Sequence, residues 1–189
     1  MNFQEYLPTV VKRAKPFDDA TQAKHGCLGM LTELGELADN IKRNLVKGIP
    51  LDLINGQEEI GDFIWYLTLW AHTQGFAGWE LDTYANESAK VGATPVDEVL
   101  LLGALAAALF VPEVHRDDNE TMLKMVFGSL NGLIFRFEGN LPAILFANDA
   151  KLEKRHGGSF NAEGSTNRDT VAERAILEKS LRDHPSTNS

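Results

Sequence analysis

Cysteine is almost absent from this sequence, and so is any long apolar segment. Cys27 is the single cysteine among 189 residues, which excludes an intramolecular disulfide and a cysteine-ligated zinc site. We expect Cys27 to be a small residue of the core. The longest apolar run, residues 99–111, is too short to span a membrane, which takes about 20 residues. The first residues lack the apolar core of a signal peptide, so the sequence predicts a cytoplasmic protein with no membrane partner.

Long runs of lysine and arginine are also missing. The chain has 18 Lys and Arg residues against 27 Asp and Glu residues, which gives a formal net charge of −9. A protein that binds a nucleic-acid polymer usually presents a basic surface to the phosphates, so the sequence predicts no such partner. The acidic surplus favours a protein that binds cations and whose substrate arrives as a metal complex.

Sustained alternation of apolar and polar residues, which would indicate strands, does not occur either. Apolar residues recur at spacings of three and four, and this predicts a single all-α domain over residues 1–189. We expect Asp18 or Asp19 to cap the second helix and Asp97 to cap the fifth. The expected helices cover residues 3–15, 20–46, 57–75, 80–90, 98–110, 119–137, 141–155 and 168–182, with a turn at Asn55-Gly56 and loops at 111–118 and 156–167.

The second and third of these helices each carry two acidic residues three positions apart. Glu33 and Glu36 lie in "ELGELAD", and Glu59 and Asp62 lie in "EEIGDFIWYL". Residues three apart share one face of a helix, and apolar residues flank both pairs. The two helices are joined by a short connection and are therefore expected to be antiparallel neighbours. The two acidic pairs should then face each other.

Four carboxylates in a partly buried space repel one another. They stay ionised only if a cation compensates them, and otherwise their pKa values rise. Oxygen ligands without a thiolate suit Mg²⁺ or Mn²⁺, and Mg²⁺ commonly links protein carboxylates to substrate phosphates. The alternative is that the acids belong to solvated helix faces, but two pairs on adjacent helices favour a metal site.

The order E-x-x-E, spacer, E-x-x-D resembles the signature of the MazG-like superfamily of all-α nucleoside triphosphate pyrophosphohydrolases. Here 22 residues separate Glu36 from Glu59, and aromatic residues follow Asp62 closely. The segment 147–169 resembles the stretch that follows the last core helix in phage and bacterial members. The resemblance covers about residues 20–75 and 140–170.

The difference from the family lies between these two parts. Family members commonly pass quickly from the E-x-x-D helix to the next motif, whereas about 65 residues intervene in this chain. We expect a core bundle over residues 1–75 and 140–170, with extra helices inserted over residues 80–138. The extra helices are expected to build a homodimer or homotetramer around the catalytic bundle.

The resemblance implies hydrolysis of a (deoxy)nucleoside triphosphate between its α- and β-phosphates, which yields a nucleoside monophosphate and pyrophosphate. It implies that Glu33, Glu36, Glu59 and Asp62 are catalytic and hold Mg²⁺, with Mn²⁺ as the alternative ion. The role would be control of a nucleotide pool, in the host cytoplasm if a phage encodes the chain. The base is left open: a purine triphosphate such as dGTP is one candidate, and phosphoribosyl-ATP is an alternative substrate.

The resemblance also points to residues that would bind the substrate. Asn148, Lys151 and Arg155 share one helix face, and the two cations suit phosphate oxygens, although a solvated basic face is the alternative. Tyr66 lies one turn beyond Asp62 and is expected to touch the substrate. Lys47 either complements the helix dipole or contacts a phosphate.

Other residues near these motifs are expected to have structural roles. Glu58 points about 100° away from the acidic face and should be solvated. Trp65, Trp70 and Trp79 are expected to pack rather than to stack on a base, and His25 and His72 to be packed or partly exposed.

Two other classes of protein are open alternatives. A di-iron carboxylate bundle needs two Glu-x-x-His motifs, and the sequence has the spacing only once, at Glu153 and His156. A non-enzymatic helical module for oligomerisation or partner binding would use the apolar helices over residues 98–137.

Overall fold

The computed structural model describes residues 1–90, 94–109, 116–157, 159 and 170–183. These residues form eight helices and their connections, with no strand among them, so the all-α prediction is confirmed for this part of the chain. The helices are α1 (Phe3–Arg13), α2 (Asp19–Lys47), α3 (Leu53–Thr73), α4 (Gly78–Glu87), α5 (Pro95–Ala108), α6 (Arg116–Arg136), α7 (Leu141–His156) and α9 (Thr170–Asp183).

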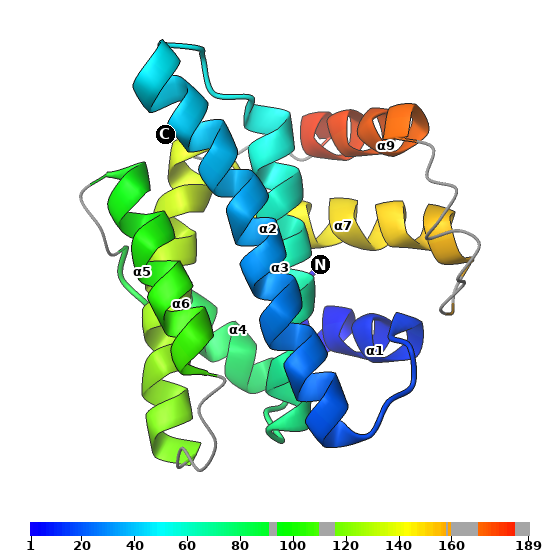
Figure 1. Cartoon of the computed structure of the whole chain (residues 1–189). Coiled ribbons are helices and arrows are strands. Elements are labelled where there is room, and N and C mark those ends of the chain that lie inside the picture. The colour runs from blue at the N-terminus through cyan, green and yellow to red at the C-terminus, as the bar shows by residue number, and fades with distance from the viewer. Residues whose placement is uncertain (91–93, 110–115, 158, 160–169, 184–189) are drawn as a thin grey trace.

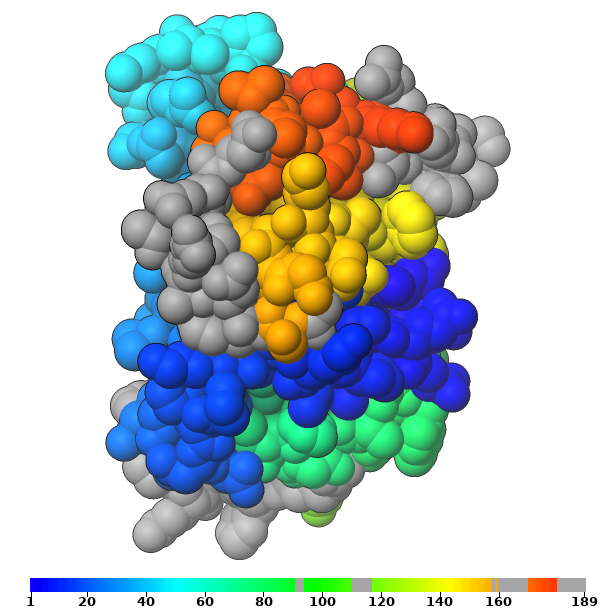
Figure 2. Space-filling view, turned by 90° about the vertical axis from the view of Figure 1, so that its right-hand side faces the viewer, coloured from blue at the N-terminus to red at the C-terminus, as the bar shows by residue number. Residues whose placement is uncertain are grey.

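Helices α2 and α3 form an antiparallel pair at the centre of the molecule (Figure 1). Helices α5 and α6 pack together on one side of this pair, with α5 against α2. Helices α1, α7 and α9 lie on the other side, where Figure 2 shows them stacked one above another. Helix α7 contacts both α3 and α9, and α1 contacts α3, α4 and α7. The acidic pair of helices is therefore covered by elements from both ends of the chain.

One cluster of buried apolar side chains joins α1 to α7. Trp70 is only 2% exposed and Cys27 only 3%, so both are core residues, as their sequence contexts predicted. Full burial of a large apolar side chain contributes about 1.5–3 kcal/mol, so this cluster stabilises the arrangement that brings α2, α3 and α7 together. Trp79, in contrast, is 59% exposed on α4, so the prediction that it packs is wrong.

The turn predicted at Asn55-Gly56 is wrong, because α3 begins before it. Asp52 caps α3 by accepting a hydrogen bond from the backbone N–H of Asn55, at 3.0 Å. A Cβ atom on Gly56 would lie 2.2 Å from the ring of Phe137. Gly56 therefore serves close packing between helices, which a sequence cannot distinguish from a turn signal.

Two more helix starts differ from the prediction. Helix α5 is capped by the side chain of Thr94, with Pro95 in its first turn, and not by Asp97. Helix α6 begins at Arg116, so residues 116–118 are helical, whereas 111–115 of the expected loop lie outside the described residues. Most of the loop expected at 156–167 also lies outside them. The cap of α2 is Asp18, one of the two candidates.

Candidate active site

Paired hydrogen bonds hold the register of α2 against α3. The side chain of Asn40 on α2 donates to the backbone carbonyl of Asp52 at 2.9 Å and accepts from the backbone N–H of Asp52 at 3.1 Å. Asn40 is 2% exposed, so this amide is shielded from water. On the same face, Gly29 allows close contact with α3, because a Cβ atom there would lie 2.1 Å from the ring of Tyr66. The two acidic pairs thereby meet.

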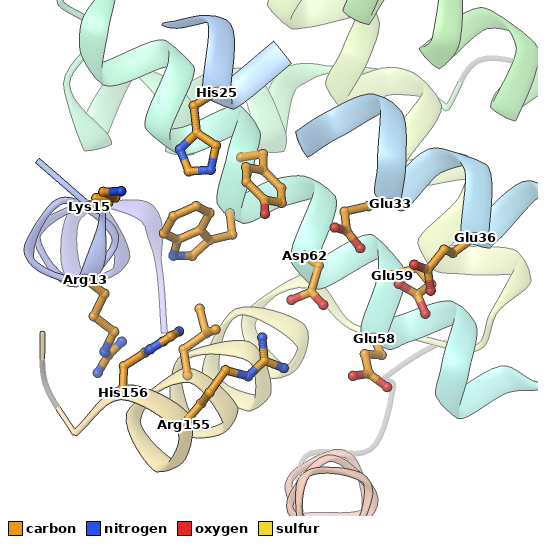
Figure 3. A pocket seen from close by; sticks show the side chains of 13 residues that line it. Arg13, Lys15, His25, Glu33, Glu36, Glu58, Glu59, Asp62, Arg155 and His156 are labelled. Carbon is orange, nitrogen blue, oxygen red and sulfur yellow. The ribbon is translucent and has the colours of Figure 1, made fainter. Parts of the chain in front are cut away.

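Three of the four predicted acidic residues form a compact cluster. Glu33, Glu59 and Asp62 each offer one carboxylate oxygen, and these oxygens all lie within 4.8 Å of one another. Glu59 is 5% exposed, while Glu33 and Asp62 are half-buried. Glu36 lines the same cavity without belonging to this group of three (Figure 3). The cluster contains only oxygen ligands, which is the donor set that Mg²⁺ and Mn²⁺ prefer.

The two glutamates of this cluster are short of positive charge. Burial, then the charges of Asp62 and Glu36, raises the pKa of Glu33 to about 7. The same causes in the same order, followed by the charge of Glu58, raise the pKa of Glu59 to about 9. Glu59 also accepts a hydrogen bond from Asn55 Nδ2 at 2.6 Å. The raised pKa values mean that the ionised cluster gains stability when a cation is bound.

The raised pKa values predict how the stability of the metal-free protein depends on pH. In the folded state Glu33 and Glu59 bind protons more tightly than in the unfolded state, so stability falls as pH rises from about 5 to about 9. Each carboxyl contributes up to about 1.4 kcal/mol per pH unit. Melting curves recorded with a chelator should shift downward over this range, and millimolar Mg²⁺ should reduce the shift. A melting temperature that rises from pH 6 to pH 9 in the chelator would contradict the burial of these acids.

Asp62 differs from the other two acids because it has a cation beside it. Lys151 Nζ lies 2.5 and 2.7 Å from the two oxygens of Asp62 and 3.2 Å from Glu58. Lys151 is fully buried, which by itself lowers the pKa of the ammonium, but Asp62 and Glu58 outweigh burial and raise it. Glu58 is therefore half-buried and paired, and the prediction that it is solvated is wrong.

A chain of two hydrogen bonds also orients Asp62. Asn148 Nδ2 donates to Asp62 Oδ1 at 2.5 Å, and the hydroxyl of Tyr6 donates to Asn148 Oδ1 at 2.6 Å. Tyr6 is fully buried and Asn148 is 2% exposed. Because Tyr6 occupies the amide oxygen, the amide nitrogen is directed at Asp62. Residues from α1, α3 and α7 thus meet at one carboxylate.

The structure separates the five predicted substrate-binding residues into three groups. Arg155 and Tyr66 line the cavity. Asn148 and Lys151 are buried against Asp62 and are not among the lining residues, so the alternative of a solvated basic face is wrong for them. Lys47 is exposed at the end of α2 and is not among the lining residues either.

The cavity has a volume of about 410 Å³, within the range of small-molecule sites. Figure 3 shows an acidic end, with Glu33, Glu36, Glu58, Glu59 and Asp62, and an opposite end with Arg13, Lys15 and His156. Arg155 lies between these ends in the same view and donates to Glu173 on α9 at 2.9 and 2.8 Å. The lining residues are Arg13, Lys15, His25, Glu33, Glu36, Glu58, Glu59, Asp62, Trp65, Tyr66, Leu152, Arg155 and His156.

For several residues that line the cavity, the sequence predicted no functional role. His25 lies two turns before Glu33 on the same face of α2, so helical spacing could have identified it. Its ring packs edge-on to Trp65 and Tyr66, with centroids 6.3 and 5.4 Å apart. Arg13 comes from α1, and no local signal relates α1 to the acidic motif. Trp65 was expected only to pack, and it also lines the cavity.

The structure does not favour a di-iron carboxylate site. Glu153 donates no ligand to the acidic cluster and instead accepts a hydrogen bond from Arg13 at 2.6 Å. The one group of potential metal ligands found among the described residues contains no histidine.

Comparisons with protein-family models, with curated proteins and with solved structures give no match to this chain. Among the described residues, no helix is both long enough and apolar enough to cross a membrane. The functional assignment therefore depends on the geometry of the cavity and on the resemblance of the acidic motif.

Proposed function

We propose that this chain is a metal-dependent pyrophosphohydrolase of (deoxy)nucleoside triphosphates, of the MazG-like type. It cleaves the substrate between the α- and β-phosphates and releases a nucleoside monophosphate and pyrophosphate. The observation that carries the proposal is the cluster of Glu33, Glu59 and Asp62 at one end of a cavity with cationic residues at its other end. The cavity volume of about 410 Å³ is within the range of small-molecule sites.

The residues of the cluster fit a divalent ion by chemistry and by charge. Glu33, Glu59 and Asp62 would hold Mg²⁺ or Mn²⁺, and Glu36 lies beside them on the cavity wall. When bound, the ion supplies neutralisation of phosphate charge and a lower pKa for a water molecule. Glu36 is the carboxylate that would accept a proton from the attacking water, because it lines the cavity outside the group of three, whereas Glu58, the other such acid, is paired with Lys151.

Arg155 is positioned to bind the phosphates. Its guanidinium lines the cavity and suits bidentate contact with phosphate oxygens. It is paired with the buried Glu173, so a phosphate would share or replace this partner. Lys151 and Asn148 would act through Asp62, whose position they hold by hydrogen bonds to its carboxylate.

The test is to incubate the purified protein with each common NTP and dNTP and with Mg²⁺ or Mn²⁺, and to separate the products by chromatography. The expected products are the monophosphate and pyrophosphate, and a chelator should abolish their formation. A nucleoside diphosphate with inorganic phosphate would show a different cleavage site. No turnover of any triphosphate with either ion would contradict the proposal.

Replacing Tyr6 with phenylalanine tests the hydrogen bonds that orient Asp62. Without the hydroxyl, the amide of Asn148 loses the partner that fixes its orientation, and Asp62 is held less well. We expect kcat to fall about 10-fold and KM to change little, since Tyr6 does not line the cavity. Binding of Mn²⁺, followed by electron paramagnetic resonance, should weaken in parallel. Unchanged kcat and unchanged Mn²⁺ affinity would show that Tyr6 only packs.

Three further expectations stay predictions: a homodimer or homotetramer, a cytoplasmic location, and a role in control of a nucleotide pool. A homodimer or homotetramer would bury exposed apolar side chains at its interface. Candidates are Leu28 and Leu31 on α2 and Leu100 on α5. Helices α2 and α5 are in contact, so these side chains lie on neighbouring helices.

A further inference from the structure

Two buried N–H groups in the wall of the cavity have no hydrogen-bond acceptor among the described residues. They are Nε of Arg13 and Nε1 of Trp65. Arg13 is 7% exposed, and its other two nitrogens bind Asp149 and Glu153, so the guanidinium is held in place with one donor unsatisfied. A buried donor without an acceptor is unfavourable, and a ligand that supplies an acceptor removes this penalty.

This part of the cavity is rich in groups that donate hydrogen bonds and cannot accept them. Arginine, lysine and tryptophan side chains have no acceptor, and Arg13, Lys15 and Trp65 all line the cavity, beside His25, Tyr66 and His156, whose side chains can donate or accept. Two acidic side chains of α7, Asp149 and Glu153, already form ion pairs with Arg13. A ligand oxygen can accept from the two N–H groups that lack an acceptor among the described residues, whereas a ligand amino group would leave them unpaired.

The base is the part of the substrate that this region would receive. Under the proposed function the phosphates lie at the acidic end with the metal and Arg155, which leaves the rest of the cavity, where Arg13 and Trp65 are lining residues, for the nucleoside. The rings of His25, Trp65 and Tyr66 pack edge-to-face there, with the last two 4.9 Å apart, and form an apolar wall for a flat ring.

Bases differ in the hydrogen-bonding groups at their edges. Guanine presents two acceptors, N7 and O6, and thymine or uracil presents O4, whereas adenine and cytosine present an amino group at the equivalent position. We propose that the Arg13–Trp65 end of the cavity selects nucleotides with an oxo base over those with an amino base. This inference rests on the proposed function and names the substrate class within it.

Matched substrates that differ at this position test the selection directly. Hypoxanthine and adenine differ only by the oxo or amino group at C6 and the proton on N1, and uracil and cytosine differ in the corresponding way. The value of kcat/KM should be at least about tenfold higher for dITP than for dATP, and for dUTP than for dCTP. Equal or reversed values in both pairs would overturn the inference and leave the proposed function intact.

Trp65→Phe keeps an aromatic ring and removes the indole N–H donor together with part of the ring area. We expect this variant to reduce the oxo preference to about threefold or less, mainly through KM for the oxo substrates. Trp79→Phe is the matched control, because Trp79 is exposed on α4 and outside the cavity, and it should keep the full preference. An oxo preference that Trp65→Phe leaves unchanged would remove Trp65 from the selection.

Binding experiments separate failure of the inference from failure of the proposed function. Titration calorimetry with IMP and AMP, and with UMP and CMP, measures base selection without any turnover. Tighter binding of IMP and UMP would support the oxo-base site even if no triphosphate is hydrolysed. Equal binding within both pairs would contradict it even if hydrolysis occurs.

Discussion

Glu59→Gln is expected to lower the rate of pyrophosphate release by on the order of a thousandfold, because the variant loses a charged metal ligand. Glutamine has the same shape and can still accept the hydrogen bond from Asn55, so the local structure should persist. The charge is what the substitution removes, and the metal affinity depends on that charge. Steady-state assays at saturating and at limiting Mg²⁺ would measure the loss, and calorimetric titration with Mn²⁺ would show the weaker binding.

Asp39→Asn is the matched control for this loss. Asp39 lies on α2, is exposed, pairs with Lys42 and does not line the cavity. Its replacement should leave turnover within about twofold, since exposed ion pairs contribute little. Glu59→Gln should also melt no lower than the wild type in a chelator at pH 8, because burial disfavours the ionised carboxylate. Wild-type turnover in Glu59→Gln would exclude the cluster as the catalytic metal site.

Lys151→Met is expected to lower the free energy of unfolding by about 3–5 kcal/mol, the largest stability effect that we expect for a polar residue of the site. Methionine retains most of the apolar volume, so the effect comes from charge. Lys151 is fully buried, and its removal leaves Asp62 and Glu58 without the cation that compensates them. Urea unfolding followed by circular dichroism at pH 7 would measure the change.

Two further variants show whether the loss comes from the buried charges. Lys42→Met removes an exposed lysine from α2 and should change the free energy of unfolding by less than about 1 kcal/mol. Adding Glu58→Gln to Lys151→Met should restore part of the stability, because one of the two uncompensated charges disappears. If Lys151→Met is as stable as Lys42→Met, the ion pairs with Asp62 and Glu58 contribute nothing to folding.

Local pattern was sufficient for the helices and for the acidic motif. A helix repeats every 3.6 residues, so the spacing of apolar residues reveals both its presence and its buried face. The same regularity places Glu33 with Glu36 and Glu59 with Asp62, and the short connection makes their helices antiparallel. The oxygen-rich cluster could therefore be predicted without coordinates. Errors occurred where one residue type has two uses, as at Gly56, which packs against Phe137 instead of forming a turn.

Contacts between distant segments decided what the other side chains do. The position of Glu58 on its helix predicted a solvated carboxylate, but α7 brings Lys151 to within 3.2 Å of it. Asn148 and Lys151 were predicted on the correct helix, yet their side chains donate hydrogen bonds to Asp62 instead of facing the cavity. Arg13 reaches the cavity from α1, and nothing near it in the sequence indicates this.

The sequence by itself determined an all-α chain with facing carboxylates, because helical periodicity and charge repulsion are properties of neighbouring residues. Only the tertiary structure decided that Asp62, among those carboxylates, has the ammonium group of Lys151 beside it. That difference depends on burial and on distances of a few ångströms between α1, α3 and α7, since the energy of a charge is set by everything packed around it.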